Sequence, residues 1–340
     1  MKYLIALTTA LFSIASVAWA GIFNPDNVSV EARWVVHLDV EALTSSEFGA
    51  CLIKGLQSQE ENPLTQMEAE IGINPLEDIY SLTAYGTGEP PAKGISVEVT
   101  GEDVSVGAVA RPGGNAVVLA VMSDAIDALI QQLAADEQRY EKISRAGYTI
   151  HSWADEDSDA RWYLYQQPIE NESRRLVLAS DNSDALFEGI RVLAGDAPSL
   201  ADVNRDDRQL PQPGSMLFAS VDDIGDLAGH EAASELLKRT KRLAVDLVEH
   251  EGTVILNISA QTDSPEAATT ITQIIQGALA VATLAVDPND DEAAAVKALV
   301  QNLNFTTEGR RMSLEFQQPA EVLCQLLEAA GEGLQFGEGD

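Results

Sequence analysis

The stretch WVVHLDV, Trp34 to Val40, is the starting point for the fold because its β-branched and aromatic residues predict a strand. A helix is expected directly after the aspartate, over Glu41 to Gln57. The same order of strand, Asp and helix returns at Ala219-Ser220-Val221-Asp222. Each half then continues with a strand pair and a helix, and closes with another strand pair and helix. The chain is therefore predicted to hold two similar units.

The closing segments of the two halves align without a gap. Arg174 to Leu178 (RRLVL) lies over Arg310 to Leu314 (RRMSL), and a helical pattern follows each. In a third strand, Val254, Leu256 and Ile258 are expected on one side and Thr253, Ile255 and Asn257 on the other. Paired strands joined by short turns favour antiparallel sheets, since parallel strands need long crossovers. The predicted fold class is α+β: two similar units, each a mainly antiparallel sheet covered by helices on one face.

The predicted domain limits follow from composition. Residues 1–20 form a signal peptide, 21–200 the first unit, 201–214 a linker and 215–340 the second unit. The linker is assigned because it contains Pro211 and Pro213, many charges and few apolar residues.

The first twenty residues have the layout of a secretory signal peptide. Lys2 supplies a positive start, an apolar run covers Leu4 to Val17, and Ala18-Trp19-Ala20 precedes Gly21. Cleavage is predicted between Ala20 and Gly21. The alternative is an uncleaved anchor, but the apolar run is shorter than the roughly 20 residues that a spanning helix needs. The mature protein is expected to be periplasmic or secreted, without stable insertion in a membrane.

The chain is strongly acidic, with 54 Asp and Glu against 21 Lys and Arg and a net charge of −33. Nucleic acids and anionic membrane surfaces are excluded as partners because both would be repelled. The acids are dispersed along the chain, which is typical of a solvated surface. Cation binding is the alternative explanation for so many carboxylates.

Two acidic stretches partly match a calcium-binding loop. Asp155, Asp157 and Asp159 fit its first three ligand positions, but Ala160 and Gln166 stand where a glycine and a bidentate Glu are needed. Asp202, Asn204 and Asp206 fail in the same way. Weak binding of divalent cations at the surface therefore stays open, and no metal ligand is assigned.

The two cysteines, Cys51 and Cys324, allow two interpretations. Outside the cytoplasm they could form a disulfide. Each also lies in an apolar helical pattern, which is typical of separate buried thiols.

No catalytic or cofactor-binding residue is assigned, and no cofactor is predicted. His230-Glu231-Ala232-Ala233-Ser234 lacks the second histidine of a zinc protease motif. The chain also lacks a nucleophile elbow and a phosphate-binding loop. Trp153, Trp162, Tyr163 and Tyr165 cluster near an acidic loop, where they would either pack across strands or stack on sugars.

The opening WVVHLDVEAL, the stretch NPLEDIYSLTAYG (Asn74 to Gly86) and the duplicated plan resemble uncharacterised secreted proteins of environmental bacteria. This resemblance implies an exported α+β protein and supplies no site. The sequence predicts a non-catalytic binding or scaffolding protein of the cell envelope, with an unknown partner. The alternative is an extracellular hydrolase that uses paired carboxylates, which sequence alone cannot locate among so many acids.

Overall fold

The computed structural model of the chain describes residues 23–58, 62–88, 96–100, 103–107, 115–154, 160–169, 172–203, 208–224, 238–285 and 302–331. The predicted signal peptide, with its cleavage point between Ala20 and Gly21, lies outside these residues. So do residues 155–159 of the first acidic loop and the motif that begins at His230.

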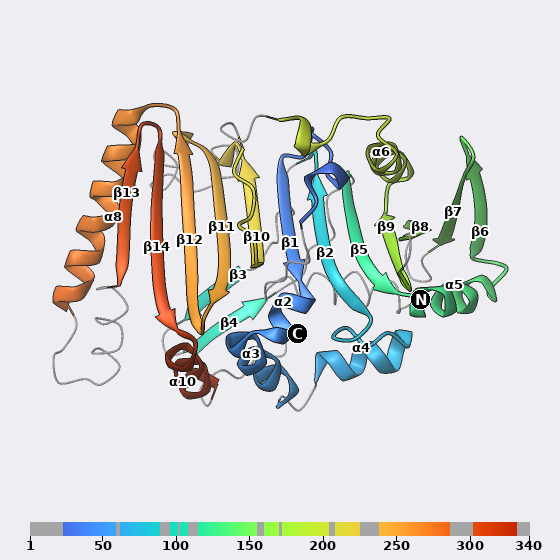
Figure 1. Ribbon diagram of the computed structural model, residues 1–340, viewed down its shortest axis with the longest axis horizontal. Coiled ribbons are helices and arrows are strands. Elements are labelled where there is room, and N and C mark those ends of the chain that lie inside the picture. Colours follow the sequence, from blue (N-terminus) through green and yellow to red (C-terminus); the bar gives the residue numbers. More distant parts are fainter. Residues whose placement is uncertain are drawn as a thin grey trace.

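Twelve strands form one continuous antiparallel sheet across the molecule (Figure 1). Their order is β13-β14-β12-β11-β10-β1-β2-β5-β9-β8-β7-β6, and β3 and β4 form a separate pair. The strands are β1 Trp34–Asp39, β2 Ile79–Gly86, β3 Ser96–Thr100, β4 Asp103–Gly107, β5 Ala116–Ser123, β6 Tyr140–Arg145, β7 Tyr148–Ala154, β8 Arg161–Pro168, β9 Arg174–Ser180, β10 Ser215–Asp222, β11 Thr240–His250, β12 Thr253–Thr262, β13 Leu303–Glu308 and β14 Arg311–Pro319.

The described helices lie around this sheet. They are α2 Val40–Ser45, α3 Glu47–Gln57, α4 Pro63–Ile71, α5 Ala125–Ala134, α6 Ser183–Leu193, α8 Pro265–Ala285 and α10 Ala320–Gly331. The single helix expected over 41–57 is two helices. Ser46 has extended backbone angles between them and accepts the Gly49 N–H, which starts α3.

The expectation of two separate sheets was wrong. Strand β1 pairs with β10 in antiparallel register, with Val36 opposite Ala219. If the halves were separate, β1 and β10 would each be an edge strand with a row of unpaired backbone groups. Their pairing removes both edges and makes one sheet. From this contact outward, the strands follow as β1-β2-β5-β9-β8-β7-β6 on one side and β10-β11-β12-β14-β13 on the other.

The prediction that helices cover only one face was also wrong for the first half of the sheet, which consists of β1, β2 and β5 to β9. Val117 and Leu119 of β5 pack in one apolar core with Leu186 and Ile190 of α6. The alternating residues of β5, including Val118, pack in a second core with residues of α2, α4 and α5. Since successive side chains of a strand point to opposite faces, this half of the sheet is buried on both.

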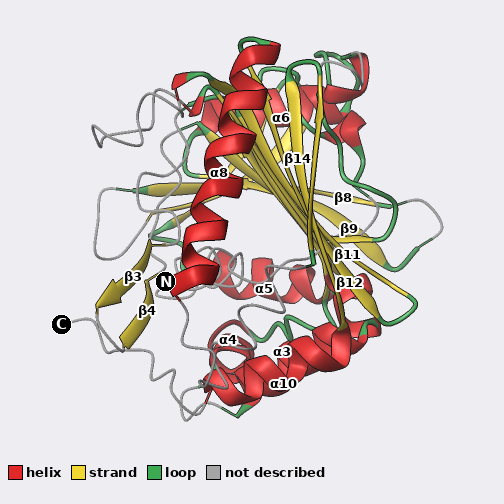
Figure 2. Cartoon of the chain, turned by 90° about the vertical axis from the view of Figure 1, so that its left-hand side faces the viewer, coloured by secondary structure: helices red, strands yellow, loops and turns green. Residues whose placement is uncertain are grey.

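The second half, β10 to β14, differs because its described helix cover lies on one face. Leu243, Ala260 and Met312 are neighbours across β11, β12 and β14, and they form a small core with Ile271 of α8. Figure 2 shows α8 and the β3–β4 pair on the same side of the sheet. On the other face of these strands, the end that holds Arg242 and Arg311 is mostly polar.

Helices α3 and α10 join the two halves at one end of the sheet, where they run side by side (Figure 2). Cys51 of α3 and Cys324 of α10 form a disulfide with a Cα–Cα distance of 5.8 Å, although they are 273 positions apart in sequence. The end of β11 adds a polar contact. The Glu249 carboxylate accepts the backbone N–H groups of Glu47 and Phe48 at 3.0 and 2.9 Å, so the second half caps α3 of the first half.

Candidate functional site

The polar face of the second half is built from cross-strand neighbours. Asp222 of β10 lies opposite Arg242 of β11, which lies opposite Gln261 of β12. Gln261 in turn lies opposite Arg311 of β14, and Arg311 opposite Glu308 of β13. We call these five residues the charged row. On the same face, the next row is Ser220, Ala244, Ser259, Ser313 and Thr306.

Two hairpin turns determine the strand register that aligns the charged row. The β11–β12 turn contains Glu251 and Gly252, with φ of 51° and 72°, and the β13–β14 turn contains Gly309, with φ of 57°. Positive φ values are usual in tight hairpin turns and cost glycine little. The turn geometry fixes the register of each hairpin, and a slip by one residue would move Arg242 and Arg311 to the apolar face.

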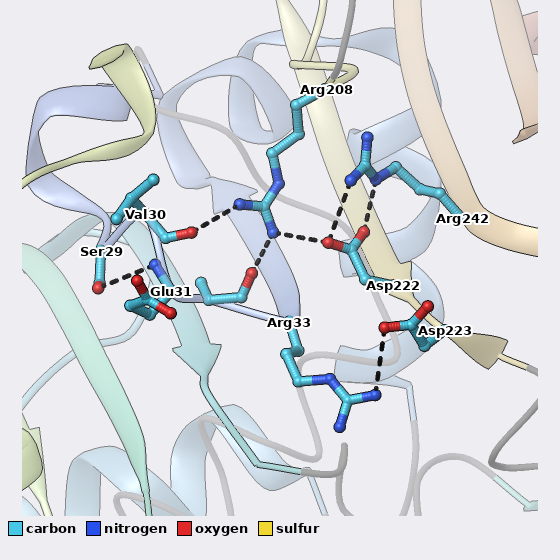
Figure 3. Close-up of polar contacts among 9 residues, drawn as sticks. Ser29, Val30, Glu31, Arg33, Arg208, Asp222, Asp223 and Arg242 are labelled. Atoms are coloured by element: carbon cyan, nitrogen blue, oxygen red, sulfur yellow. Dashed lines mark hydrogen bonds and ion pairs between the residues drawn. The ribbon is translucent and has the colours of Figure 1, made fainter. Parts of the chain in front are cut away.

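Arg208 and Arg242 both bind Asp222 at one end of the charged row (Figure 3). The Arg242 guanidinium donates Nε–H to Oδ1 and Nη2–H to Oδ2 of Asp222, the second at 3.1 Å. The Arg208 side chain is 7 % exposed, and its guanidinium donates to Asp222 Oδ2 at 3.2 Å. It also donates to the carbonyl oxygens of Val30, at 3.2 Å, and Ala32. Arg208 therefore links three backbone segments.

We call Arg208, Arg242 and Asp222 the arginine centre. Its two guanidinium groups share one carboxylate, so these three side chains together carry one positive charge. Burial lowers the pKa of Arg208 below its usual value; the negative charge of Asp222 opposes this shift and the positive charge of Arg242 adds to it. Arginine still stays protonated at neutral pH. Beside the centre, Arg33 pairs with Asp223 at 3.5 Å in a more exposed contact (Figure 3).

A small hollow lies next to Arg242 on the polar face. Its lining residues are Gln209, Arg242, Ser259, Ala260, Gln261 and Arg311. It is partly open to solvent and has room for about one water molecule. The Ser259 hydroxyl donates to Gln209 Oε1, which holds one wall of the hollow against β12. Two of the lining side chains, Arg242 and Arg311, are cations.

The segment predicted as a linker is held against the same face. Asp246 of β11 is fully buried, with Oδ1 accepting the Ser215 hydroxyl and Oδ2 accepting the Gln212 N–H at 3.0 Å. Burial raises the pKa of Asp246, and these hydrogen bonds oppose the shift. Together with Arg208 and Gln209, these contacts make the described part of 201–214 a packed segment of the site.

Of the second stretch that partly matches a calcium-binding loop, Asp202 makes no contact with the arginine centre among the contacts described below. Asp202 lies in a short 3₁₀ helix, Leu200–Asp202, where its carboxylate accepts the Ser199 N–H at 2.8 Å. Its expected companions at 204 and 206 lie outside the described residues. In the part of the chain that the structure describes, no three His, Cys, Asp or Glu side chains gather in a group that could hold a metal ion.

The aromatic cluster packs across strands. Trp153 of β7 lies opposite Trp162 of β8, and both are buried in the core that includes Leu164. Tyr140 donates to or accepts from His151 Nδ1 at 2.9 Å, and its ring lies 5.9 Å from that of Trp153. The buried tryptophan faces leave no exposed platform of these two rings for a sugar.

Sequence reasoning missed the arginine centre. Nothing in the local pattern marks Arg208, which lies in a segment with few apolar neighbours. Asp222 was noticed only as the aspartate after a strand. The two arginines come from a connecting segment and from the next strand, so only the folded register brings them to Asp222.

No protein-family model and no curated protein matches this chain. Among solved structures, it is similar to crystal form III of TP0453, a Treponema protein: 9% identity, 91% of this chain and 99% of that chain covered, and a TM-score of 0.43. Crystal form IV of TP0453 gives 11% identity, 90% and 97% coverage, and a TM-score of 0.43. Scores of this size describe a loose similarity in chain path and carry no information about activity. The search for membrane-spanning helices, made over the described residues, found none.

Proposed function

We propose that this chain is an exported, non-catalytic binding or scaffolding protein of the cell envelope. The observation that carries the proposal is the Cys51–Cys324 disulfide. Disulfides persist in oxidising compartments outside the cytoplasm and are rare within it. The disulfide joins a helix of the first half to one of the second, so an oxidising compartment would stabilise the whole sheet.

The binding part of the proposal is supported by the contrast between the two faces of β10 to β14. One face is apolar and packs against α8, while the other presents the charged row and the hollow beside Arg242. A duplicated origin of the two halves is part of the same proposal. It is supported by the similar outward order of strands, β1-β2-β5-β9-β8 and β10-β11-β12-β14-β13.

The second candidate function, a carboxylate hydrolase, is favoured by one observation. Burial raises the pKa of Asp39 to about 7, a value that suits a general acid. However, Asp39 accepts the Ala42 N–H at 2.6 Å and caps helix α2, and the nearby Glu41 is paired with Arg174. This arrangement fits a helix cap better than a pair of reacting carboxylates.

The test is export of the full chain from a bacterial host. We expect the protein in the envelope or medium to begin at Gly21 and to give no titratable thiol after denaturation without reductant. An Ala20→Asp variant, which spoils the small residue before the cleavage point, should keep the leader. Cytosolic protein that begins at Met1 and carries two free thiols would overturn the proposal.

A further inference from the structure

We propose that two copies of this chain associate edge to edge, with strand β13 of one copy paired antiparallel to β13 of the other. The partner is therefore a second copy of the chain, and the contact continues the sheet from one molecule into the next. The inference goes beyond the proposed function. It does not depend on export, because the contact needs only the folded second half.

Strand β13 is an open edge of the sheet in the part of the chain that the structure describes. Its neighbour there is β14, so the backbone groups on its other side have no described ladder partner. Asn304, Thr306, Thr307 and Glu308 of this strand are exposed. An exposed row of backbone N–H and C=O groups is a template on which another strand can pair.

The opposite edge of the sheet, β6, is protected in a way that β13 is not. Lys142 lies exposed near the middle of β6, and Arg145 pairs with Asp184 at 2.8 Å. Charged side chains, lysine above all, keep edge strands from pairing with other molecules. Residues 303–307 (LNFTT) contain neither a charge nor a proline. Of the two edges, β13 is therefore the one suited to accept another strand.

The sequence of β13 is complementary to itself in the antiparallel register that is centred on Phe305. The facing pairs of the two copies are then Phe305–Phe305, Leu303–Thr307, Asn304–Thr306 and Glu308–Asn302. Phenylalanine, leucine and threonine meet on the face that packs against α8, and amide and hydroxyl groups meet on the other face. No like charges face each other. A two-fold interface needs this match, because both copies present the same surface.

Helix α8 widens the uncharged surface beside this edge. The helix contacts β13, with the Thr272 and Thr307 hydroxyl oxygens 3.1 Å apart, and it lies at the β13 end of the sheet (Figure 1). Residues 267–285 carry no charge, and Ile274 and Val281 are 46% and 67% exposed. A second copy paired at β13 would lie next to this helix, so its contact would bury apolar surface as well as backbone groups.

The net charge of −33 on each copy opposes association at long range. This repulsion is screened over about 8 Å at physiological ionic strength, whereas the proposed contact itself contains almost no charge. The association should therefore strengthen as salt is added. A contact held by ion pairs would weaken instead, so the dependence on salt distinguishes the two kinds of interface.

The experiment is sedimentation equilibrium of the folded full-length mature chain between about 1 and about 300 µM, a range that covers weak protein pairs. We expect a monomer–dimer equilibrium whose association constant rises severalfold between about 0.05 and about 0.5 M NaCl. A double variant, Asn304→Lys with Thr306→Lys, places lysines opposite each other on both sides of the two-fold axis. It should weaken the dimer about tenfold, although it lowers the net negative charge of each copy.

The matched control is Asn304→Lys with Thr306→Glu, which changes the same two exposed positions but places opposite charges across the axis. It should associate at least as tightly as the parent, since only the proposed register makes the two double variants differ. Ser144→Lys makes a similar change at an exposed position of β6 and should alter association less than about twofold. Circular dichroism verifies that each variant folds.

Three results would overturn the inference. The first is a chain that stays monomeric over the whole range of concentration and salt. The second is equal association of the two double variants, and the third is a dimer that Ser144→Lys weakens as much as the double lysine variant does. Each of these results would leave the export test untouched, because that test depends on the leader and the disulfide.

Discussion

The two halves of the sheet have a similar order of strands but bury their faces differently. Strands β1, β2 and β5 to β9 have apolar cores on both faces, with α6 over one and α2, α4 and α5 over the other. Strands β10 to β14 have an apolar face against α8 and a polar face with the charged row. The first half therefore contributes most of the apolar core, and the second half carries polar and charged side chains on one face. A sheet can carry a polar site without losing its core when the two tasks lie in different halves.

The last residues of the two central strands, Asp39 of β1 and Asp222 of β10, also differ between the halves. Asp39 caps helix α2 through the Ala42 N–H, and its pKa is raised by burial. Asp222 instead lies between Arg208 and Arg242. The aspartate that the sequence repeats in both halves therefore has a structural partner in one and cationic partners in the other.

The largest expected difference between the two halves is the loss of stability when a core leucine is shortened to alanine. Leu178 of β9 is completely buried against α6, whereas Leu314 of β14 is only half-buried. Leu178→Ala should lower the free energy of unfolding by about 3–5 kcal/mol, because it leaves a cavity in a packed core. Leu314→Ala should cost about 1 kcal/mol. Urea unfolding measures both, and equal losses would show that the halves are packed alike.

Removing the disulfide tests how firmly the halves are joined. A Cys51→Ala and Cys324→Ala double variant should lose about 2–4 kcal/mol of stability, since the unfolded chain is no longer constrained. Lys54→Met, which breaks the exposed ion pair with Glu328 between the same helices, should leave the unfolding midpoint almost unchanged. A double variant as stable as the parent would mean that the β1–β10 pairing alone holds the halves together.

The arginine centre should show a smaller effect. Arg208→Met leaves Asp222 with one cation and two backbone carbonyls without their donor, which should cost about 2 kcal/mol. Arg33→Met removes an exposed pair with Asp223 and should cost well under about 1 kcal/mol. Chemical denaturation compares the two. A larger loss from Arg33→Met would contradict the central position of Arg208.

The smallest effect is a pH dependence at Asp39. Its pKa is raised to about 7 in the folded protein, mainly by burial and also by Glu41, against about 3.9 in the unfolded chain. Its stabilising contribution is therefore complete below about pH 4 and is lost as the pH rises through about 7. Asp39→Asn keeps the cap and removes this loss, so its stability relative to the parent should rise between about pH 5 and about pH 8. The full pKa shift would give about 2.6 kcal/mol over this range, and partial exposure to solvent should reduce it to about 1 kcal/mol. An unchanged difference in unfolding midpoints would contradict the raised pKa.

The sequence predicted the antiparallel α+β class and many of the strands because alternation and turn residues act locally. Val254, Leu256 and Ile258 do share one face, as their spacing required. Local signals could not show that β1 pairs with β10, since that contact joins segments far apart in the chain. The charged row was hidden for the same reason. Arg242 and Arg311 become neighbours of Gln261 only through the register of two hairpins.

The pairing of β1 with β10 also sets an order for folding. Strand β1 is made early and meets β2 within the first quarter of the chain, but its second neighbour is β10, Ser215–Asp222. A growing polypeptide thus carries an open strand edge until about two thirds of the chain has been synthesised. Contacts between such distant segments slow folding, because a long loop must close before they form. A chain of this topology therefore completes its sheet only late in folding.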